Sequence, residues 1–293
     1  MKKDVLLFIG LIVLLVPGCA TLGSMPVLKD GVYPLKAKIL TYFELAAKDL
    51  DLMANIAELT ETKPDDLAVD FDYQQFDEVR FGGFRFGNHE SKTWFLAGKD
   101  SSGYWSYFYI DQNLDHHLNK QEKVILQTVS GPYKGFKTKT AYTAVPIAVT
   151  VSYKGETRSF TRPLSFFIDI EDYSKNDLHD TLVKAFNATF FEGTIQVIGQ
   201  TPQLYKFRLI DTDSNGCFSD YGQDLVYIDE NNNGYFQKNE SHKLIEFFDS
   251  ADPDKQQMRI IVPPYPAKIA VIKADQTFDW IALEPVLDQS VSE

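Results

Sequence analysis

Basic residues are scarce in this chain, which has 29 Lys and Arg against 41 Asp and Glu and a formal net charge of −12. Nothing in the sequence supplies the basic stripe that phosphate binding needs, so we expect no nucleic-acid partner. An acidic balance is compatible with cation binding, although it is also the ordinary state of a soluble surface.

The motifs of several enzyme classes are missing as well. The sequence contains no G-x-S-x-G elbow, no P-loop and no dinucleotide fingerprint. His89-Glu90 lacks the second histidine of a zinc-protease helix, and the pair His116-His117 has no third ligand at metal spacing. These absences favour a protein without a catalytic centre, although they leave the question of catalysis open.

One acidic cluster admits two interpretations. Asp169, Glu171 and Asp172 follow the apolar residues 166–168. A pair of carboxylates can serve as acid and base in a hydrolase. An acidic strand end in contact with solvent is the simpler interpretation and the one we favour.

The N-terminus has the organisation of an export signal. Lys2 and Lys3 precede an apolar run over residues 5–16, which is too short to favour a membrane-spanning helix. The run ends on Val16-Pro17-Gly18-Cys19, which resembles the lipobox of bacterial lipoproteins. In that family the signal peptide is cleaved before the cysteine, whose thiol then carries a diacylglycerol. The resemblance implies a signal peptide over residues 1–19 and a lipid (palmitate-type) membrane anchor on Cys19.

A plain secretory signal with an incidental cysteine is the alternative, and both interpretations place the mature chain outside the cytoplasm. Only two cysteines are present, Cys19 and Cys217. If Cys19 is acylated, the chain cannot form an internal disulfide. Its stability would then come from core packing and from metal.

The composition, 44% hydrophobic and 14% aromatic, predicts a globular chain with a sizeable core. After a tether over residues 20–33, apolar residues recur every three or four positions, which predicts an amphipathic helix over residues 34–63. A second helix is indicated near residues 177–186. Beyond Pro64, short β-branched and aromatic runs between turn signals predict a mostly β (α+β) fold. We expect antiparallel sheets in sandwich-like halves over residues 64–180 and 181–293.

A weak internal repeat connects the two halves. Tyr109-Ile110-Asp111-x-Asn113 returns as Tyr227-Ile228-Asp229-x-Asn231, and Lys120-x-Glu122 returns as Lys238-x-Glu240 at the same offset. Each copy runs from a predicted strand into the same kind of loop. Duplication and convergent use of one hairpin device both account for the match.

Residues 229–240 fit the calcium-loop pattern D-x-[DN]-x-[DN]-G-x5-E at every position. Calcium takes six to eight oxygen ligands, which such a loop supplies from alternate side chains, one carbonyl and a final bidentate glutamate. The candidate ligands are Asp229, Asn231, Asn233, the backbone of Tyr235, Gln237 through a water, and Glu240. A polar hairpin turn is the alternative.

Residues 111–122 follow the same pattern with one departure, because His116 stands where glycine is expected. Histidine is among the residues that adopt a positive φ at some cost. The extra carboxylate favours binding and the strain opposes it, and the sequence does not show which effect wins. The candidate ligands are Asp111, Asn113, Asp115, the backbone of His117, Asn119 and Glu122.

A third candidate loop begins at Asp211 and has Gly216 at the turn position, but Gly222 occupies the place of the final acid. The shell would have to be closed by Asp220 or Asp224. The carbonyl of Cys217, and not its thiol, would face the ion, because calcium is a poor partner for sulfur. The candidate ligands are Asp211, Asp213, Asn215, Cys217, Asp220 and Asp224.

All three segments resemble the EF-hand calcium loop, although residues 107–110, 207–210 and 225–228 before them read as strands, not helices. They are more similar to the strand-flanked calcium loops of bacterial secreted and lipid-anchored proteins. That resemblance implies calcium in two to three sites and a place in the cell envelope, but no activity. We therefore expect a calcium-stabilised envelope lipoprotein with a binding or structural role, whose partner is an unknown envelope protein or glycan. A hydrolase and a carbohydrate-binding (adhesive) module remain alternatives.

Overall fold

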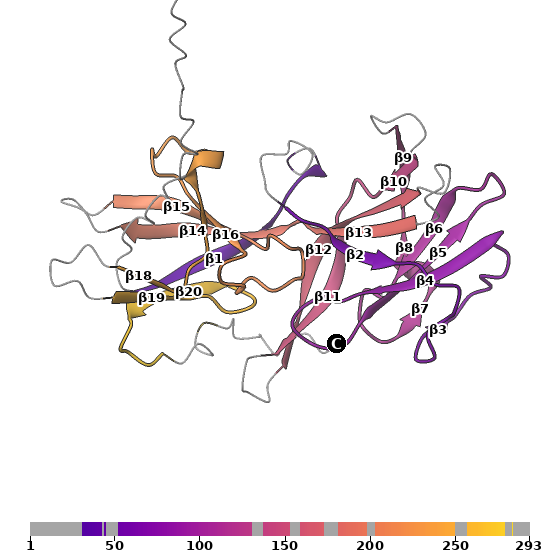
Figure 1. Cartoon of the computed structure of the whole chain (residues 1–293), viewed down its shortest axis with the longest axis horizontal. Helices are drawn as coiled ribbons and strands as arrows, with labels where there is room; N and C mark the ends of the chain where they lie inside the picture. Colours follow the sequence, from indigo (N-terminus) through magenta and orange to yellow (C-terminus); the bar gives the residue numbers. More distant parts are fainter. Residues whose placement is uncertain are drawn as a thin grey trace, which may run out of the picture.

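The computed structural model describes residues 31–42, 44, 52–130, 137–152, 159–172, 181–197, 203–249, 257–278 and 283. The predicted signal peptide with Cys19 and residues 20–30 of the tether lie outside this range. Within it the chain is mostly β, with antiparallel sheets as expected (Figure 1). No helix among the described residues is long and apolar enough to cross a membrane.

An eight-stranded antiparallel sheet lies on the left of Figure 1, with the strand order β17-β16-β15-β14-β1-β20-β19-β18. Its strands are β1 (Gly31–Ile39), β14 (Thr189–Val197), β15 (Gln203–Ile210), β16 (Leu225–Ile228), β17 (Ser241–Lys243), β18 (Phe247–Asp249), β19 (Gln257–Ile261) and β20 (Lys268–Lys273). β1 pairs with β14 on one side and β20 on the other, so the first and the last strand of the described chain are neighbours in this sheet.

A six-stranded antiparallel sheet occupies the middle of the view and contains β2 (Asn55–Glu58), β9 (Gln127–Ser130), β10 (Lys137–Thr140), β11 (Val145–Ser152), β12 (Ser159–Asp172) and β13 (Thr181–Asn187). β11 shows why these residues form a strand. Its side chains alternate between buried valine or isoleucine and more exposed residues, which is the two-residue period of a half-buried strand.

A four-stranded sheet on the right has the order β4-β5-β6-β8. Its strands are β4 (Glu78–Phe84), β5 (Thr93–Lys99), β6 (Trp105–Ile110) and β8 (Lys123–Val124), and beside it a short parallel pair joins β3 (Ala68–Val69) to β7 (His117–Leu118). We call the six-stranded sheet the middle sheet and the eight-stranded sheet the large sheet. One buried cluster includes Phe95 from the four-stranded sheet, Phe166 from the middle sheet and Phe207 from the large sheet, all with 0% exposure. The three sheets thus share one hydrophobic core.

Both predicted helices are wrong over most of the residues that the structure describes, since within the two predicted ranges only Tyr42 and Glu44 are helical. The first is replaced by β1 and β2 at its two ends, and the second gives way to β13. Leu35 and Ile39 have a helix-like spacing of four, yet backbone pairing with β14 and β20 holds this segment extended. Pairing between distant strands overrides a local periodicity of this kind.

The sheets divide the chain differently from the expected halves. β13 pairs with β12, and the change to the large sheet comes between β13 and β14, at Ala188. Residues 31–33, the end of the expected tether, already lie in β1.

Candidate metal centres

The three candidate loops each begin where a strand ends, and we call them loop I (residues 111–122), loop II (residues 211–224) and loop III (residues 229–240). β6 ends at Ile110, β15 at Ile210 and β16 at Ile228, which confirms the predicted strand flanks. The aspartate that follows each strand is fully buried, at 0% exposure in Asp111, Asp211 and Asp229. Each loop therefore starts with a carboxylate anchored in the core.

The first aspartate organises the backbone of its loop in the same way in all three. One carboxylate oxygen accepts the N–H of the fifth loop residue, and the other accepts the N–H of the sixth. The donors and distances are Asp115 (3.2 Å) and His116 (3.0 Å) in loop I, Asn215 (3.3 Å) and Gly216 (2.7 Å) in loop II, and Asn233 (2.9 Å) and Gly234 (2.8 Å) in loop III. The chain consequently turns around each aspartate.

The same turn imposes a left-handed backbone at the fourth and sixth positions of each loop. The φ angles are 61° at Leu114 and 62° at His116, 56° at Ser214 and 83° at Gly216, and 56° at Asn232 and 88° at Gly234. His116 therefore does adopt the positive φ that its position requires, in a conformation that glycine takes without cost.

An acid at the far end closes each loop by accepting two backbone N–H groups, one near the start and one near the end. Glu122 accepts those of Gln112 (2.8 Å) and Asn119 (3.1 Å), Asp224 those of Thr212 (3.0 Å) and Asp220 (2.9 Å), and Glu240 those of Asn231 (3.3 Å) and Gln237 (3.0 Å). Loop II thus uses Asp224, two residues later than the final acids of the other loops.

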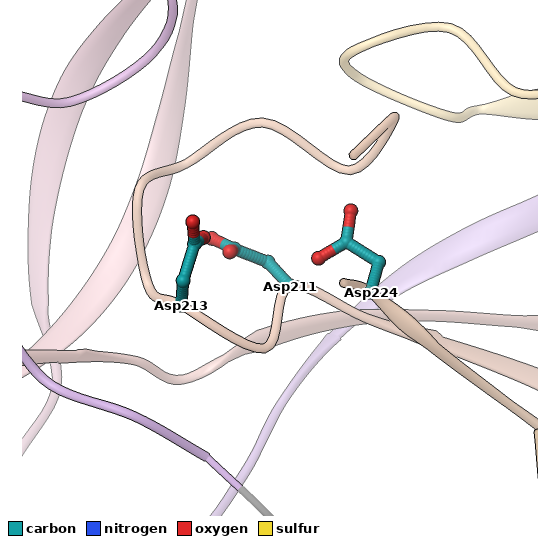
Figure 2. Close-up of side chains that lie close together, drawn as sticks. All are labelled: Asp211, Asp213 and Asp224. Carbon is teal, nitrogen blue, oxygen red and sulfur yellow. The ribbon is translucent and has the colours of Figure 1, made fainter. Parts of the chain in front are cut away.

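Loop II gathers three carboxylates, and Figure 2 shows Asp211 and Asp213 from its start beside Asp224 from its end. One oxygen from each lies within 4.8 Å of the others. Two oxygens at 2.3–2.6 Å from one calcium ion can be no more than about 5 Å apart, so the spacing fits a common ion. This triad can hold a metal ion. In the described part of the chain, no other three acidic, histidine or cysteine side chains come as close together.

Burial makes it energetically unfavourable for the carboxyl groups of this triad to be ionised without a cation. It raises the pKa of Asp224 to about 8, and burial together with the neighbouring Asp224 raises the pKa of Asp211 well above its ordinary value. Burial also raises the pKa of Asp220. A bound divalent ion would supply the positive charge that these carboxylates otherwise lack.

Loop II also ties separate sheets together. The Met53 N–H, just before β2, donates to the Thr212 carbonyl at 2.7 Å, and the Ser214 hydroxyl donates to the Met53 carbonyl at 2.7 Å. Asn187 at the end of β13 donates its amide to Asp211 at 2.6 Å. On the other side, the N–H of Phe218 donates to the Pro264 carbonyl at 3.0 Å. A well-defined conformation of loop II therefore stabilises the contact between the middle and large sheets.

Sequence reasoning did not find Asn187 and Ser214. Asn187 lies on a strand 24 residues before its partner Asp211, so no local spacing points to it. Ser214 occupies the fourth loop position, where its buried hydroxyl accepts the Asn187 N–H at 3.0 Å. The left-handed turn that brings it there is a consequence of the motif, but its partner is set by the tertiary fold.

The other expected ligands of loop II occupy distinct roles. Asp220 accepts the Asn215 side-chain amide at 2.5 Å and does not belong to the triad. Burial raises the pKa of the Cys217 thiol to about 12, so the thiol stays protonated.

Loops I and III are more exposed than loop II. Asn113, Asp115, Asn231 and Asn233 are exposed, whereas the closing Glu122 and Glu240 are buried. The third-position oxygen accepts the N–H of the fifth residue in both loops, at 3.2 Å in loop I and 3.0 Å in loop III. These loops share the backbone geometry of loop II but hold the side chains of their third and fifth positions at the surface.

Three further ligand candidates are also engaged in the backbone of their loops. The Asn119 side chain accepts the Gln121 N–H at 2.8 Å and caps the short 3-10 helix η1 (Lys120–Glu122). Gln237 begins the equivalent turn, η3 (Lys238–Glu240). The backbone N–H of His117 donates to the Asp115 carboxylate at 2.8 Å.

The adjacent histidines of loop I point to different partners. His116 Nδ1 lies 3.2 Å from Asp66, and His117 Nδ1 lies 3.8 Å from Asp70. The two rings therefore do not converge on a common point, as expected from their adjacent positions on a loop.

The acidic cluster on β12 shows one perturbed carboxyl. Burial raises the pKa of Asp169 to about 6, and its buried Oδ1 has no hydrogen-bond partner among the described residues. Glu171 is held by Lys184 at 2.6 Å. Asp169 and Glu171 therefore do not offer the two free carboxyl groups that a paired-carboxylate mechanism uses.

The raised pKa of Asp169 has a consequence for stability. Its unfolded-state pKa is near 3.8, so between pH 4 and pH 7 unfolding releases a proton and the folded state loses stability as pH rises. Asp169→Asn removes this loss. The free energy of unfolding of the variant minus that of the native chain should therefore increase by about 2 kcal/mol from pH 4 to pH 8. Urea denaturation in chelator measures the difference. The exposed Asp275→Asn is the control, and a pH-independent difference for Asp169→Asn would contradict the account.

The fold and the loops define a β-rich chain with three strand-flanked acidic loops, one of which forms a buried triad able to hold a metal ion. Comparison with protein-family models, with curated proteins and with solved structures finds no match to this chain.

Proposed function

We propose that this chain is a membrane-anchored, extracytoplasmic calcium-binding lipoprotein, in which calcium is structural and the domain has a binding or envelope-structural role. The observation that carries the proposal is the common backbone of loops I, II and III. Each loop turns around a buried aspartate and is closed by a buried acid. Three loops of the same geometry in one chain favour a shared ligand over three coincidental turns.

The donor set favours calcium among the common metals. Every candidate ligand offers oxygen, from carboxylates, amides and carbonyls, and oxygen-only sites suit hard cations. Magnesium demands a tighter octahedral shell at about 2.0–2.1 Å and keeps several waters, which a twelve-residue wrapping loop does not favour. Sites of this kind outside the cell work at Kd values of about 10⁻⁴ to 10⁻³ M, where calcium stabilises a fold without acting as a signal.

The lipid anchor is tested by cell fractionation of a bacterial host that expresses the full chain. We expect the native chain in the membrane fraction, labelled by a clickable palmitate analogue, and Cys19→Ser unlabelled in the soluble extracytoplasmic fraction. Cys217→Ser is the matched control, because its buried thiol should not affect location. A native chain that is exported but neither labelled nor membrane-bound would overturn the anchor and leave a plain secretory signal.

A further inference from the structure

A groove of about 760 Å³ opens on the outer face of the large sheet, next to loop III. Its floor is made by β1, β14 and β15, and one wall is the turn of loop III. The residues that line it are Pro34, Lys36, Lys38, Glu44, Glu192, Gly193, Thr194, Lys206, Phe207, Arg208, Gly234, Tyr235 and Phe236. The volume falls in the range of ligand sites, roughly 300–1,000 Å³.

The groove is basic in a strongly acidic protein. Four basic and two acidic side chains line it, whereas the whole chain carries a net charge of −12. Glu192 is already neutralised, because it binds Lys38 and accepts the Arg208 Nε–H at 2.8 Å. Glu44 accepts the backbone N–H of Thr41 at 2.8 Å. Basic side chains that gather in one groove of an otherwise acidic protein indicate that the groove attracts an anion.

Two lysines are left to bind that anion. Within the part of the chain that the structure describes, neither Lys36 nor Lys206 contacts a carboxylate; Lys206 donates only to the Gly234 carbonyl, at 3.1 Å. The strand registers pair Lys36 with Glu192 and Lys206 with Thr194, so the lysines stand diagonally across β14. Standard strand spacings put their Cα atoms about 12 Å apart, which is enough to flank a sugar-sized group.

We infer that this groove binds an anionic saccharide, with its carboxylate or phosphate held between Lys36 and Lys206. Aromatic residues supply the remaining contact surface. Tyr235 is 76% exposed at the rim, and Phe236 lies with its ring 4.6 Å from the Arg208 guanidinium. An exposed tyrosine ring and a half-buried phenylalanine ring beside an arginine suit a ligand that combines apolar C–H faces with negative charge.

The concave shape separates this ligand from an anionic membrane. The lysines stand on the sheet floor beside the wall formed by loop III, where a flat bilayer surface would meet the protruding Tyr235 first. A single saccharide chain can enter the groove and reach the lysines. The shape therefore favours the saccharide, and binding to lipid vesicles is an alternative outcome of the test.

Loop III connects the groove to the proposed calcium site, and in this respect the inference rests on the proposed function. Gly234, whose N–H is held by Asp229 at 2.8 Å, offers its carbonyl to Lys206, and the next two residues form the wall. Calcium in loop III would fix this wall before the ligand arrives. Preorganisation of that kind increases affinity without adding a contact.

The test is calorimetric titration of a hyaluronan tetrasaccharide into residues 19–293 carrying Cys19→Ser, a soluble chain that retains every described residue. We expect binding in calcium, weaker binding in chelator, and no binding of neutral chitotetraose. Lys36→Gln with Lys206→Gln should raise the Kd about tenfold or more. The charge-matched control, Lys243→Gln with Lys273→Gln at exposed positions outside the groove, should change it less than about twofold.

Several outcomes would overturn the inference: no saccharide binding, equal effects of the two double variants, or phosphatidylglycerol vesicles bound in place of the saccharide. Inorganic phosphate that competes as well as the saccharide would show a simple anion site and overturn the saccharide class. Failure here is distinguishable from failure of the proposed function. A chain that melts higher in calcium but binds no saccharide contradicts only the groove, and lysine-dependent binding in a chain indifferent to calcium contradicts only the calcium role.

Discussion

Calcium should raise the melting temperature of residues 19–293 (Cys19→Ser) by about 3–10 °C for each occupied loop, when the metal is added at about 10 mM to chelated protein. At Kd values of about 10⁻⁴ to 10⁻³ M, mass action contributes about 1.4–2.7 kcal/mol per site. A chain of this size gains about 2–4 °C per kcal/mol. Magnesium at the same concentration should have a much smaller effect, because the loops wrap a larger ion.

Variants separate the three loops in this measurement. Asp229→Ala with Glu240→Ala should remove the increment of loop III, and Asp111→Ala with Glu122→Ala that of loop I, while the other increments remain. A matched control substitutes exposed residues outside the loops, Asp275→Ala with Glu58→Ala. A melt that ignores calcium up to about 10 mM in the native chain would mean that these segments are polar turns.

Asp211→Ala should be the most destabilising loop substitution. In the native chain Asp211 accepts the N–H of Gly216 at 2.7 Å and the side-chain amide of Asn187 at 2.6 Å, both buried. Each donor left without a partner costs about 1–3 kcal/mol. Relief of repulsion from Asp224 offsets part of this loss, so we expect about 3 kcal/mol in chelator and about 5 kcal/mol in calcium, where the ion is lost too.

The matched substitution is Asp229→Ala at the same position of loop III. Its two backbone donors, Asn233 and Gly234, lie at a more exposed turn, where water can replace the carboxylate. We expect about 1 kcal/mol in chelator, measured with urea for both variants. Equal costs for Asp211→Ala and Asp229→Ala would contradict the role of loop II as the link between sheets. If Asp211→Ala does not fold, Asp213→Ala tests the ion without removing the buried hydrogen bonds.

The loops were predictable because their information is local. Alternate oxygen-bearing residues, a turn residue and a closing acid fall within about a dozen positions, and the structure brings them to one backbone geometry. Even the backbone strain at His116, which stands where the loop pattern has glycine, could be predicted from the sequence. The choice of Asp224 over Asp220 was not, because it depends on how the chain from Asp220 to Asp224 folds back onto Thr212.

The N-terminal segment shows why the rest was not predictable. Leu35 and Ile39 match a helical period, but β1 is held by partners at least 150 residues away in β14 and β20. Asn187 illustrates the same limit in the site, since its contact with Asp211 follows from the position of β13. The basic groove likewise depends on long-range strand pairing. β1 with Lys36 and β15 with Lys206 lie on the two sides of β14, and the strand register brings the two lysines near each other.

The most direct test of the central claim is a calorimetric count of calcium ions bound to residues 19–293 (Cys19→Ser), compared with Asp111→Ala, Asp213→Ala and Asp229→Ala. The account predicts up to three calcium ions per native chain with Kd values near 10⁻⁴ to 10⁻³ M, and one fewer ion in a variant of any occupied loop. An absence of calcium binding up to about 10 mM, or a stoichiometry that none of the three substitutions changes, would contradict it.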